Sequence, residues 1–310
     1  MQPRPAVWIP ADAPGAARAR LGRLAHVDEM PAPGARPEGR TRADIVVVGD
    51  TPPAATAFFA GIQGLQVIQA LSAGVDSLVG HVPAGVTLCD AAGAYDDAVA
   101  EWVLMAILAA RRGLPSYVDA QRAATWRRSG RVGASDELTG GTALILGYGS
   151  IGRAVERRLA ACGMKVLRVA RHARPGVATM ADVPELLPQA AVVVLLVPLT
   201  EATRGLVDRR FLAAMAPGAL LVNAARGALV DTTALLRELT SGRLRAALDV
   251  TDPEPLPDGH PLWSAPGVII TPHVAGATEQ SRLRAWSIAA AQVSRYRRGV
   301  PLRNVVSDGY

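Results

Sequence analysis

The stretch ALILGYGSIG at residues 143–152 decides the fold of this chain of 310 residues. Its first four residues are apolar and predict a strand. The next six follow the pattern Gly-x-Gly-x-x-Gly, and apolar residues then recur at Ile151, Val155 and Leu159 with helical spacing. The glycine pattern alone is a weak signal, but its place between a strand and a helix predicts a phosphate-binding turn at a helix N-terminus.

Each glycine of this turn has a predicted role in holding a dinucleotide. Gly147 permits the tight turn, Gly149 lets the backbone approach a pyrophosphate, and Gly152 lets the helix pack close to the strand. The helix N-terminus adds amide donors and the positive end of a dipole. We therefore predict a Rossmann unit that binds NAD or NADP through the whole loop: Gly147, Tyr148, Gly149, Ser150, Ile151 and Gly152.

The residues about 20 positions after the turn predict which dinucleotide is preferred. A site for NAD normally carries an acidic residue there, which accepts hydrogen bonds from the ribose 2′-hydroxyl. In this chain the place holds Arg171, followed by His172 and Arg174. Positive charge without a carboxylate suits the 2′-phosphate of NADP, so NADP is the expected preference. The alternative is that these side chains face solvent and both cofactors are accepted.

Short apolar runs separated by polar or helical stretches extend along the whole chain. This spacing predicts an α/β fold of two doubly wound parallel-sheet domains. Helices are expected at residues 98–112, which are apolar on almost every side, and at 279–298, which are expected to return to the first domain. A polar connector that contains Trp126 is expected after the first helix, and surface connections are expected at residues 31–42 and 51–53. We therefore predict a Rossmann cofactor domain, residues 94–277, inserted in a discontinuous flavodoxin-like substrate domain, residues 1–93 and 278–310. The predicted strands are residues 7–9, 45–48, 67–71, 86–89, 143–146, 165–170, 191–197, 220–223, 246–250 and 268–270.

Composition excludes several classes of protein. The net charge is +6, but the arginines are scattered instead of forming a basic run, so nucleic acid is not an expected partner. The cysteines, Cys89 and Cys162, are too few for a disulfide framework, and each lies in an apolar stretch as a buried thiol does. The sequence shows neither a secretory leader nor an apolar run of about 20 residues. We expect a cytoplasmic protein with no membrane partner, and we assign no metal site.

Three further motifs each follow a predicted strand: VNAARGALVD at residues 222–231, LDVTDPEPL at 248–256 and TPHVAG at 271–276. Ligands of open α/β sheets bind at this end of the strands. Together with the glycine turn, the motifs closely resemble the D-isomer-specific 2-hydroxyacid dehydrogenase family, in particular glyoxylate/hydroxypyruvate reductases. The resemblance covers essentially the whole chain. It implies that Arg226 binds the substrate carboxylate and carbonyl, that His273 is the general acid and base, and that Glu254 is the partner of that histidine.

The chemistry of hydride transfer asks independently for these residue types. A 2-oxo acid needs a planar cation that grips two oxygens, and a guanidinium does so with fixed geometry. Hydride addition builds charge on the carbonyl oxygen, so a proton donor that titrates near neutrality is needed, and histidine is suited to this. A neighbouring carboxylate favours the charged imidazolium and holds its orientation. The remaining histidines have no such company.

The resemblance also implies secondary site residues. A loop at residues 71–76 resembles the family's substrate loop, whose backbone amides meet the carboxylate at Ala73, Gly74 and Val75. Asn223 and Asp249 resemble positions near the nicotinamide and its ribose. The remaining cofactor candidates are Pro198, Thr203 and Ala224. Asp231 is predicted to cap the following helix and to take no part in the reaction.

Departures from the family's other branches narrow the prediction. Formate-oxidising members carry glutamine where this chain has Glu254, and phosphite-oxidising members carry a lysine in the loop at 71–76, which has none. Glyoxylate, hydroxypyruvate and larger 2-oxo acids all stay open as substrates. Some corepressors resemble the same family and keep its three catalytic residue types, so an NAD(P)-binding sensor is the alternative function. The family's long helix helps to form a two-fold dimer, and a homodimer is therefore expected.

Overall fold

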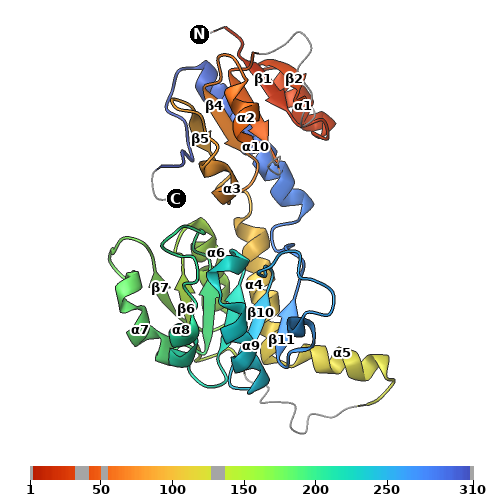
Figure 1. Cartoon of the computed structure of the whole chain (residues 1–310), viewed down its shortest axis with the longest axis vertical. Helices are drawn as coiled ribbons and strands as arrows, with labels where there is room; N and C mark the ends of the chain where they lie inside the picture. Colours follow the sequence, from red (N-terminus) through yellow and green to blue (C-terminus); the bar gives the residue numbers. More distant parts are fainter. Residues whose placement is uncertain (1–2, 32–41, 50–54, 127–136, 308–310) are drawn as a thin grey trace. The chain divides into compact units, whose positions relative to one another are not determined.

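The structure, a computed structural model, describes residues 3–31, 42–49, 55–126 and 137–307 (Figure 1). By its contacts the chain divides into two units, Met1–Tyr95 with Thr278–Tyr310 and Asp96–Ala277. Most of the loop expected at residues 31–42, the turn expected at 51–53 and the part of the connector that follows Trp126 lie outside the described residues.

The first unit is a parallel sheet with the strand order β2-β1-β3-β4-β5. This is the flavodoxin-like order, as predicted. The edge strand β2 was not predicted, because its sequence HVDE is short, polar and only partly buried. The strands are β1 (Ala6–Ile9), β2 (His26–Glu29), β3 (Ile45–Val48), β4 (Val67–Ala70) and β5 (Thr87–Cys89), and the helices are α1 (Gly15–Gly22), α2 (Ala55–Ala60), α3 (Asp76–Val79) and α10 (Glu279–Arg297).

Helices cover both faces of this sheet. Successive strand side chains point to opposite faces, so a strand such as β1 contributes to two clusters, one on each face. On one face, Val7 and Ile9 pack in a cluster with Leu21 of α1 and with Trp286 of α10. On the other face, Trp8 belongs to a cluster that includes residues of α2 and α3. The helix α10 comes from the far end of the chain and packs beside α1. The first unit is therefore built from two separate segments of sequence.

The second unit is a parallel sheet with the strand order β11-β10-β9-β8-β6-β7. The strand order reverses direction between β6 and β8, which makes this pair the switch point where such sheets bind ligands. The strands are β6 (Thr142–Leu146), β7 (Lys165–Val169), β8 (Val192–Leu195), β9 (Leu220–Asn223), β10 (Arg245–Leu248) and β11 (Val268–Ile270), and the helices are α4 (Asp96–Arg111), α5 (Leu114–Arg122), α6 (Ser150–Ala161), α7 (Val183–Leu186), α8 (Arg209–Ala214) and α9 (Thr232–Thr240).

Two strands of this sheet end two residues earlier than predicted, at Leu195 and Leu248. The predictions extended them to Val197 and Val250, which are apolar and buried but lie in loops. Burial without a strand partner explains the error, because hydrophobicity reports burial and not hydrogen-bond pairing. These extra residues belong to the carboxyl edge of the sheet, where the candidate site lies.

The long apolar helix α4 forms as predicted and packs on α6 and on the sheet. The polar connector predicted after it is partly wrong, because residues Leu114–Arg122 form a second helix, α5. Gly113 adopts a left-handed conformation with φ +66° between the two helices. Pro115 is then tolerated because it lies in the first turn of α5, where its missing N–H is not needed. The chain therefore passes from one helix to the next through a turn of two residues, Arg112 and Gly113.

Other details of the sequence prediction can be compared with the described residues. Cys89 is fully buried, and burial raises the pKa of its thiol to about 11. Cys162, also predicted to be buried, is only partly so, because it is the C-cap residue of α6. Asp231 caps α9 as predicted, accepting a hydrogen bond from the amide of Ala234 (2.9 Å). Within the described chain, no helix combines the length and apolar character needed to cross a membrane.

Candidate active site

The glycine turn lies between β6 and α6 and is packed so tightly that two of its glycines are obligatory. Gly147 has φ +105°, and a Cβ added there would lie 2.4 Å from the carbonyl carbon of Leu196, just after β8. A Cβ on Gly152 would lie 2.6 Å from the Gly147 oxygen. The amides of Gly147 and Tyr148 both donate to the carbonyl of Val169, each at 3.0 Å. The turn is thus held against the ends of three strands, β6, β7 and β8.

The middle glycine meets a different environment. A Cβ added to Gly149 would meet no atom within 4 Å, so space is open in front of this residue. Gly149 is also the N-cap of α6, which is 12 residues long and presents its first amides at this point. Open space before the amides of a helix N-terminus is the arrangement that binds a pyrophosphate. The residues of the turn therefore fit a dinucleotide.

The three basic residues predicted to face a 2′-phosphate follow β7 and are exposed. Arg174 begins a tight turn with Pro175 and Gly176 at its centre, in which the amide of Val177 donates to the Arg174 carbonyl (2.8 Å). Gly176 has φ +73°, which suits the third residue of a type II turn. Arg174 Nη2 also donates to the carbonyl of Tyr148 at 2.7 Å. The basic loop, residues 171–176, is therefore tied to the glycine turn.

The loop after β8 holds two further candidates, Pro198 and Thr203. Thr203 Oγ1 donates to the Pro198 carbonyl (2.7 Å) and accepts from the amide of Thr200 (2.8 Å). The hydroxyl therefore closes the turn at residues 198–203, next to the switch point. The structure gives Thr203 an organising role in the shape of this loop.

The remaining motifs of the second unit emerge together at the carboxyl edge of neighbouring strands. Asn223 pairs in register with Leu248, which pairs with Ile270, so the loops that follow β9, β10 and β11 begin side by side. Asn223 is buried, and its amide side chain donates to the Arg226 carbonyl (2.8 Å) and accepts from the amide of Ala225 (3.1 Å). Asn223 thus orders the loop of Ala224, Ala225 and Arg226.

Gly227 was not singled out from the sequence, yet its backbone packs very closely against the backbone of another loop. A Cβ added there would lie 1.8 Å from the carbonyl oxygen of Thr251, so only glycine fits. Thr232 Oγ1 donates to the Asp252 carbonyl at 2.9 Å in the same region. The loop that carries Arg226 is therefore packed directly on the loop that leads to Glu254. The available signal was a glycine directly after Arg226, the arginine predicted to bind the substrate.

His273 and Glu254, from two different loops, form a hydrogen bond. His273 Nδ1 lies 2.6 Å from Glu254 Oε1, and the two side chains are 48% and 40% exposed. His273 has a left-handed backbone conformation, φ +55°, which is uncommon for a residue with a side chain. Its amide donates to the carbonyl of Asp249 at 2.7 Å. The pair therefore presents an oriented imidazole to solvent at the carboxyl edge of the sheet.

Asp249, the first residue after β10, bonds to the residues around His273, which we call the histidine loop (residues 271–275). Its carboxylate is 2% exposed and accepts three hydrogen bonds. Oδ1 accepts from Thr271 Oγ1 (2.6 Å) and from the Val274 amide (2.8 Å), and Oδ2 accepts from the Ala275 amide (2.8 Å). These contacts fix residues on both sides of His273. The sequence placed Asp249 near the nicotinamide, but its tie to the histidine loop was not predicted.

The predicted substrate loop belongs to the first unit. It follows β4, and Ser72 Oγ donates to the carbonyl of Gly74 at 2.8 Å. Val75 is buried and caps α3, while Ala73 and Gly74 are only partly buried. The structure thus brings Asp249, Glu254 and His273 into contact in one unit, whereas residues 73–75 lie at the carboxyl end of a strand in the other.

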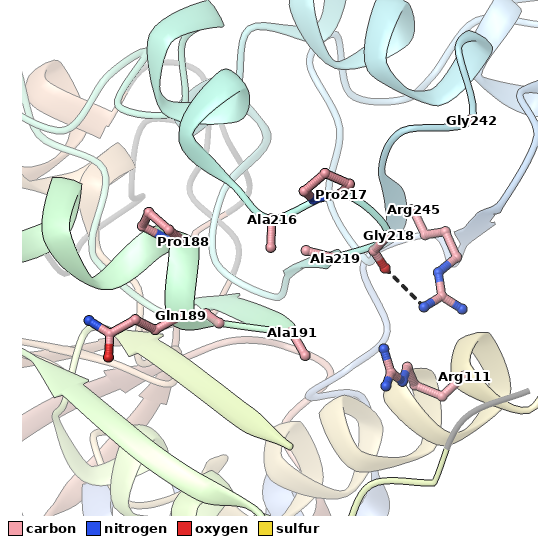
Figure 2. Close-up of a pocket in the computed structure, with 11 residues that line it drawn as sticks. Arg111, Pro188, Gln189, Ala191, Ala216, Pro217, Gly218, Ala219, Gly242 and Arg245 are labelled. Carbon is pink, nitrogen blue, oxygen red and sulfur yellow. Dashed lines mark hydrogen bonds between the residues drawn. The ribbon is translucent and has the colours of Figure 1, made fainter. Parts of the chain in front are cut away.

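A pocket of about 440 Å³ in the second unit lies away from this chemistry (Figure 2). Its residues include Ala191 and Ala219, each of which immediately precedes a strand, and Arg245, which begins β10. Arg245 donates to the Gly218 carbonyl at 3.0 Å, across the pocket wall shown in Figure 2. The pocket therefore lies at the amino edge of the sheet, opposite to the edge where parallel sheets bind ligands.

Comparisons with known proteins agree with this geometry. The model described as "D-isomer specific 2-hydroxyacid dehydrogenase, NAD binding domain" matches residues 104–275. A D-3-phosphoglycerate dehydrogenase of Methanocaldococcus jannaschii is 34% identical over 276 residues, which are 86% of this chain and 52% of that relative. The chain thus spans about half the length of that enzyme.

Two solved structures are similar over nearly the whole chain. A D-isomer specific 2-hydroxyacid dehydrogenase from Xanthobacter autotrophicus Py2, in complex with NADPH and MES, is 30% identical with a TM-score of 0.85 and covers 99% of this chain and 98% of its own. An NADPH-dependent glyoxylate/hydroxypyruvate reductase from Sinorhizobium meliloti, in complex with NADP and sulfate, is 29% identical with a TM-score of 0.83 and covers 98% of each chain.

Proposed function

The chain belongs to the D-isomer specific 2-hydroxyacid dehydrogenase family, and from this membership we propose that it transfers a hydride between NADP(H) and a small 2-oxo or D-2-hydroxy acid. The observation that carries the proposal is the 2.6 Å pair of His273 and Glu254, at the carboxyl edge of the sheet that also carries the glycine turn. A proton donor and a dinucleotide turn on one sheet are the two parts that such a reaction needs.

A nicotinamide dinucleotide held by the glycine turn would supply or accept the hydride, and the side chains of the protein would bind the acid and move its proton. Because Glu254 engages Nδ1, Nε2 is the ring atom that gives a proton to the carbonyl oxygen in reduction and takes it back in oxidation. The hydrogen bond to Glu254 fixes the orientation of the ring. Arg226 is proposed to grip the carboxylate and the carbonyl oxygen, because a guanidinium offers five N–H donors in one plane.

The basic loop supports NADP as the preferred cofactor. Arg171, His172 and Arg174 are exposed after β7, and Arg174 contacts the glycine turn itself. Contacts between arginine and phosphate are charge-assisted and strong, whereas a ribose hydroxyl needs an acceptor that this loop does not provide. The two similar structures described above were both determined with NADPH or NADP bound.

Turnover assays test the proposal directly. We expect loss of reduced-cofactor absorbance with at least one acid from a panel of glyoxylate, hydroxypyruvate, pyruvate and phenylpyruvate. The kcat/KM for NADPH is expected to exceed that for NADH by about 10- to 100-fold, the value of one or two charge-assisted hydrogen bonds. A preference for NADH would contradict the cofactor assignment. Tight NADPH binding without turnover of any acid would favour a cofactor-sensing protein instead.

We also propose that the chain forms a homodimer through α4 and α5. On α4, Met105 and Leu108 are 48% and 40% exposed, and Trp126, just after α5, is 90% exposed. Met105 and Leu108 are three positions apart and so lie on one face of α4, and exposed apolar faces mark association sites. Light scattering is expected to give twice the 32.3 kDa mass of one chain. A variant that combines Met105→Glu and Leu108→Glu is expected to have the mass of one chain. Val79→Glu, at an exposed valine of the first unit, is the control; a monomeric wild type would contradict the proposal.

A further inference from the structure

Three side chains beside the glycine turn form a polar cluster that the proposed reaction does not use. Tyr148 lies in the turn, Glu156 in α6 and Arg168 in β7. The Tyr148 hydroxyl donates to Glu156 Oε2, and Arg168 donates to Glu156 Oε1 from Nε at 2.7 Å and also from Nη2. One carboxylate therefore joins the turn, the helix and the strand. We call these three residues the Glu156 cluster.

The cluster is partly buried and keeps its charges. The side chain of Glu156 is 16% exposed and that of Arg168 is 35% exposed. Burial alone would raise the pKa of Glu156, but the hydrogen bonds from Arg168 and Tyr148 and the charge of Arg168 bring it below its ordinary value. Burial, and then the neighbouring carboxylate, raise the pKa of Tyr148, so its hydroxyl keeps its proton and stays a donor. The cluster is thus an ionised carboxylate held by two donors at neutral pH.

The Glu156 cluster is connected to the basic loop at two points. Arg168 Nη1 donates to the carbonyl of Gly176 (3.4 Å), in the tight turn that Arg174 begins. Arg174 Nη2 donates to the Tyr148 carbonyl (2.7 Å). The guanidinium carbons of Arg168 and Arg174 lie 5.8 and 5.6 Å from the centre of the Tyr148 ring, within the range of cation–π attraction. Tyr148 therefore connects the other two residues of the cluster to Arg174, one of the residues proposed to bind the 2′-phosphate.

We propose that the Glu156 cluster positions Arg174 for the 2′-phosphate of NADPH, so that cofactor preference depends on Tyr148, Glu156 and Arg168 as well as on the arginines of the basic loop. This inference rests on the proposed preference for NADP. An exposed arginine loses much side-chain freedom when it binds an anion, and a contact that restrains it beforehand lowers that cost. The bond to the Tyr148 carbonyl occupies one of the five guanidinium donors, and the others suit phosphate oxygens.

The test compares the NADPH-to-NADH ratio of kcat/KM in wild type and variants. Because both cofactors are measured on the same preparation, the fraction of folded enzyme cancels. Tyr148→Phe removes the hydroxyl and keeps the ring, and is expected to lower the ratio about threefold, at the low end for one hydrogen bond. Tyr148→Leu also removes the ring, and is expected to lower it about tenfold.

For Glu156→Gln, the two explanations predict opposite changes in the NADPH-to-NADH ratio. Removing a negative charge near a phosphate site would, by relief of Coulomb repulsion alone, strengthen NADPH binding and raise the ratio. If the carboxylate acts by holding Tyr148 and Arg168, the ratio falls instead. A rise in the ratio would overturn the positioning role. The control is Glu238→Gln, which breaks another partly buried pair of this unit, Glu238 with Arg243 (2.5 Å), and is expected to leave the ratio unchanged.

A double-mutant cycle with Arg174→Ala asks whether Tyr148 acts through Arg174. Arg174→Ala is expected to lower the ratio about 10- to 100-fold, and adding Tyr148→Leu to it is expected to lower it no further. Full additivity of the two effects would refute the link. Calorimetric titration with adenosine 2′,5′-bisphosphate and with adenosine 5′-monophosphate gives a readout without turnover, and only the first is expected to bind more weakly in the variants.

The outcomes separate the inference from the proposed function. A wild-type ratio near or below one would contradict the NADP preference itself, and the positioning role would fail with it. A wild-type ratio well above one that Tyr148→Leu and Glu156→Gln leave unchanged would refute the positioning role alone, while the NADP preference stands.

Discussion

Replacing His273 with alanine is expected to lower kcat/KM for 2-oxo acid reduction by about 10²- to 10⁴-fold, the usual contribution of a positioned acid or base. The structure gives the reason, because the imidazole is paired with Glu254 at 2.6 Å and is still 48% exposed. The loss is expected in kcat, since the proton is needed only as charge develops on the carbonyl oxygen. The measurement is steady-state kinetics with the best acid of the panel and saturating NADPH.

Two companion variants sharpen this result. Glu254→Gln still offers an oxygen to Nδ1 but no negative charge, so a smaller loss of about 10-fold is expected. His26→Ala, at an exposed histidine of β2, is the control and is expected to keep full activity. The Kd for NADPH should be unchanged in all three proteins. Retention of wild-type kcat in His273→Ala would contradict the proposed role of His273 as general acid and base.

The parts of the site that the sequence predicted are those in which a residue acts through its own type and local place. Gly147 and Gly152 were predicted because a turn between a strand and a helix leaves no room for a side chain, and the structure shows that lack of room directly. The doubly wound class of the fold could be predicted because parallel strands need crossover connections. Asp231 was predicted as a cap because capping involves only the next few residues.

The parts that the sequence did not predict depend on contacts between distant segments. Gly227 is obligatory only because Thr251 lies against it, 24 positions later in the chain. Glu156 and Arg168 are ordinary helix and strand residues until the parallel pairing of β6 with β7 brings them together beside Tyr148. The helix α5 was not predicted because its composition is polar. It packs on α4, the helix that precedes it. Tertiary contact, not local preference, decides these features.

Asp249 shows how such a contact controls the proposed chemistry. Its buried carboxylate bonds Thr271, Val274 and Ala275, and its backbone carbonyl accepts from the amide of His273. His273 has φ +55°, a conformation that costs free energy for a residue with a Cβ. The bonds on either side of it therefore hold the proposed general acid in a conformation that it would not adopt on its own.

Asp249→Asn is expected to destabilise the protein and to lower its activity. The amide side chain matches the carboxylate in shape, but its NH₂ group would face either the Val274 and Thr271 donors or the Ala275 amide, so at least one buried donor loses its acceptor. The expected loss is about 2–4 kcal/mol in the free energy of unfolding, since bonds to a charged group are worth about 1.5–3 kcal/mol each. For a protein of this size that corresponds to a fall in Tm of roughly 3–6 °C.

The activity of Asp249→Asn separates positioning from simple stability. A displacement of about 1 Å in a catalytic group can cost about 10²-fold in rate, so kcat/KM is expected to fall by about that factor at a temperature where the variant is folded. Asp208→Asn is the matched control, because Asp208 also accepts two backbone amides, from Arg210 and Phe211, at the start of α8. It is expected to lower Tm and leave kcat unchanged. Equal kcat values in the two variants would mean that Asp249 only stabilises the fold, whereas a loss confined to Asp249→Asn would show that the buried carboxylate sets the position of His273.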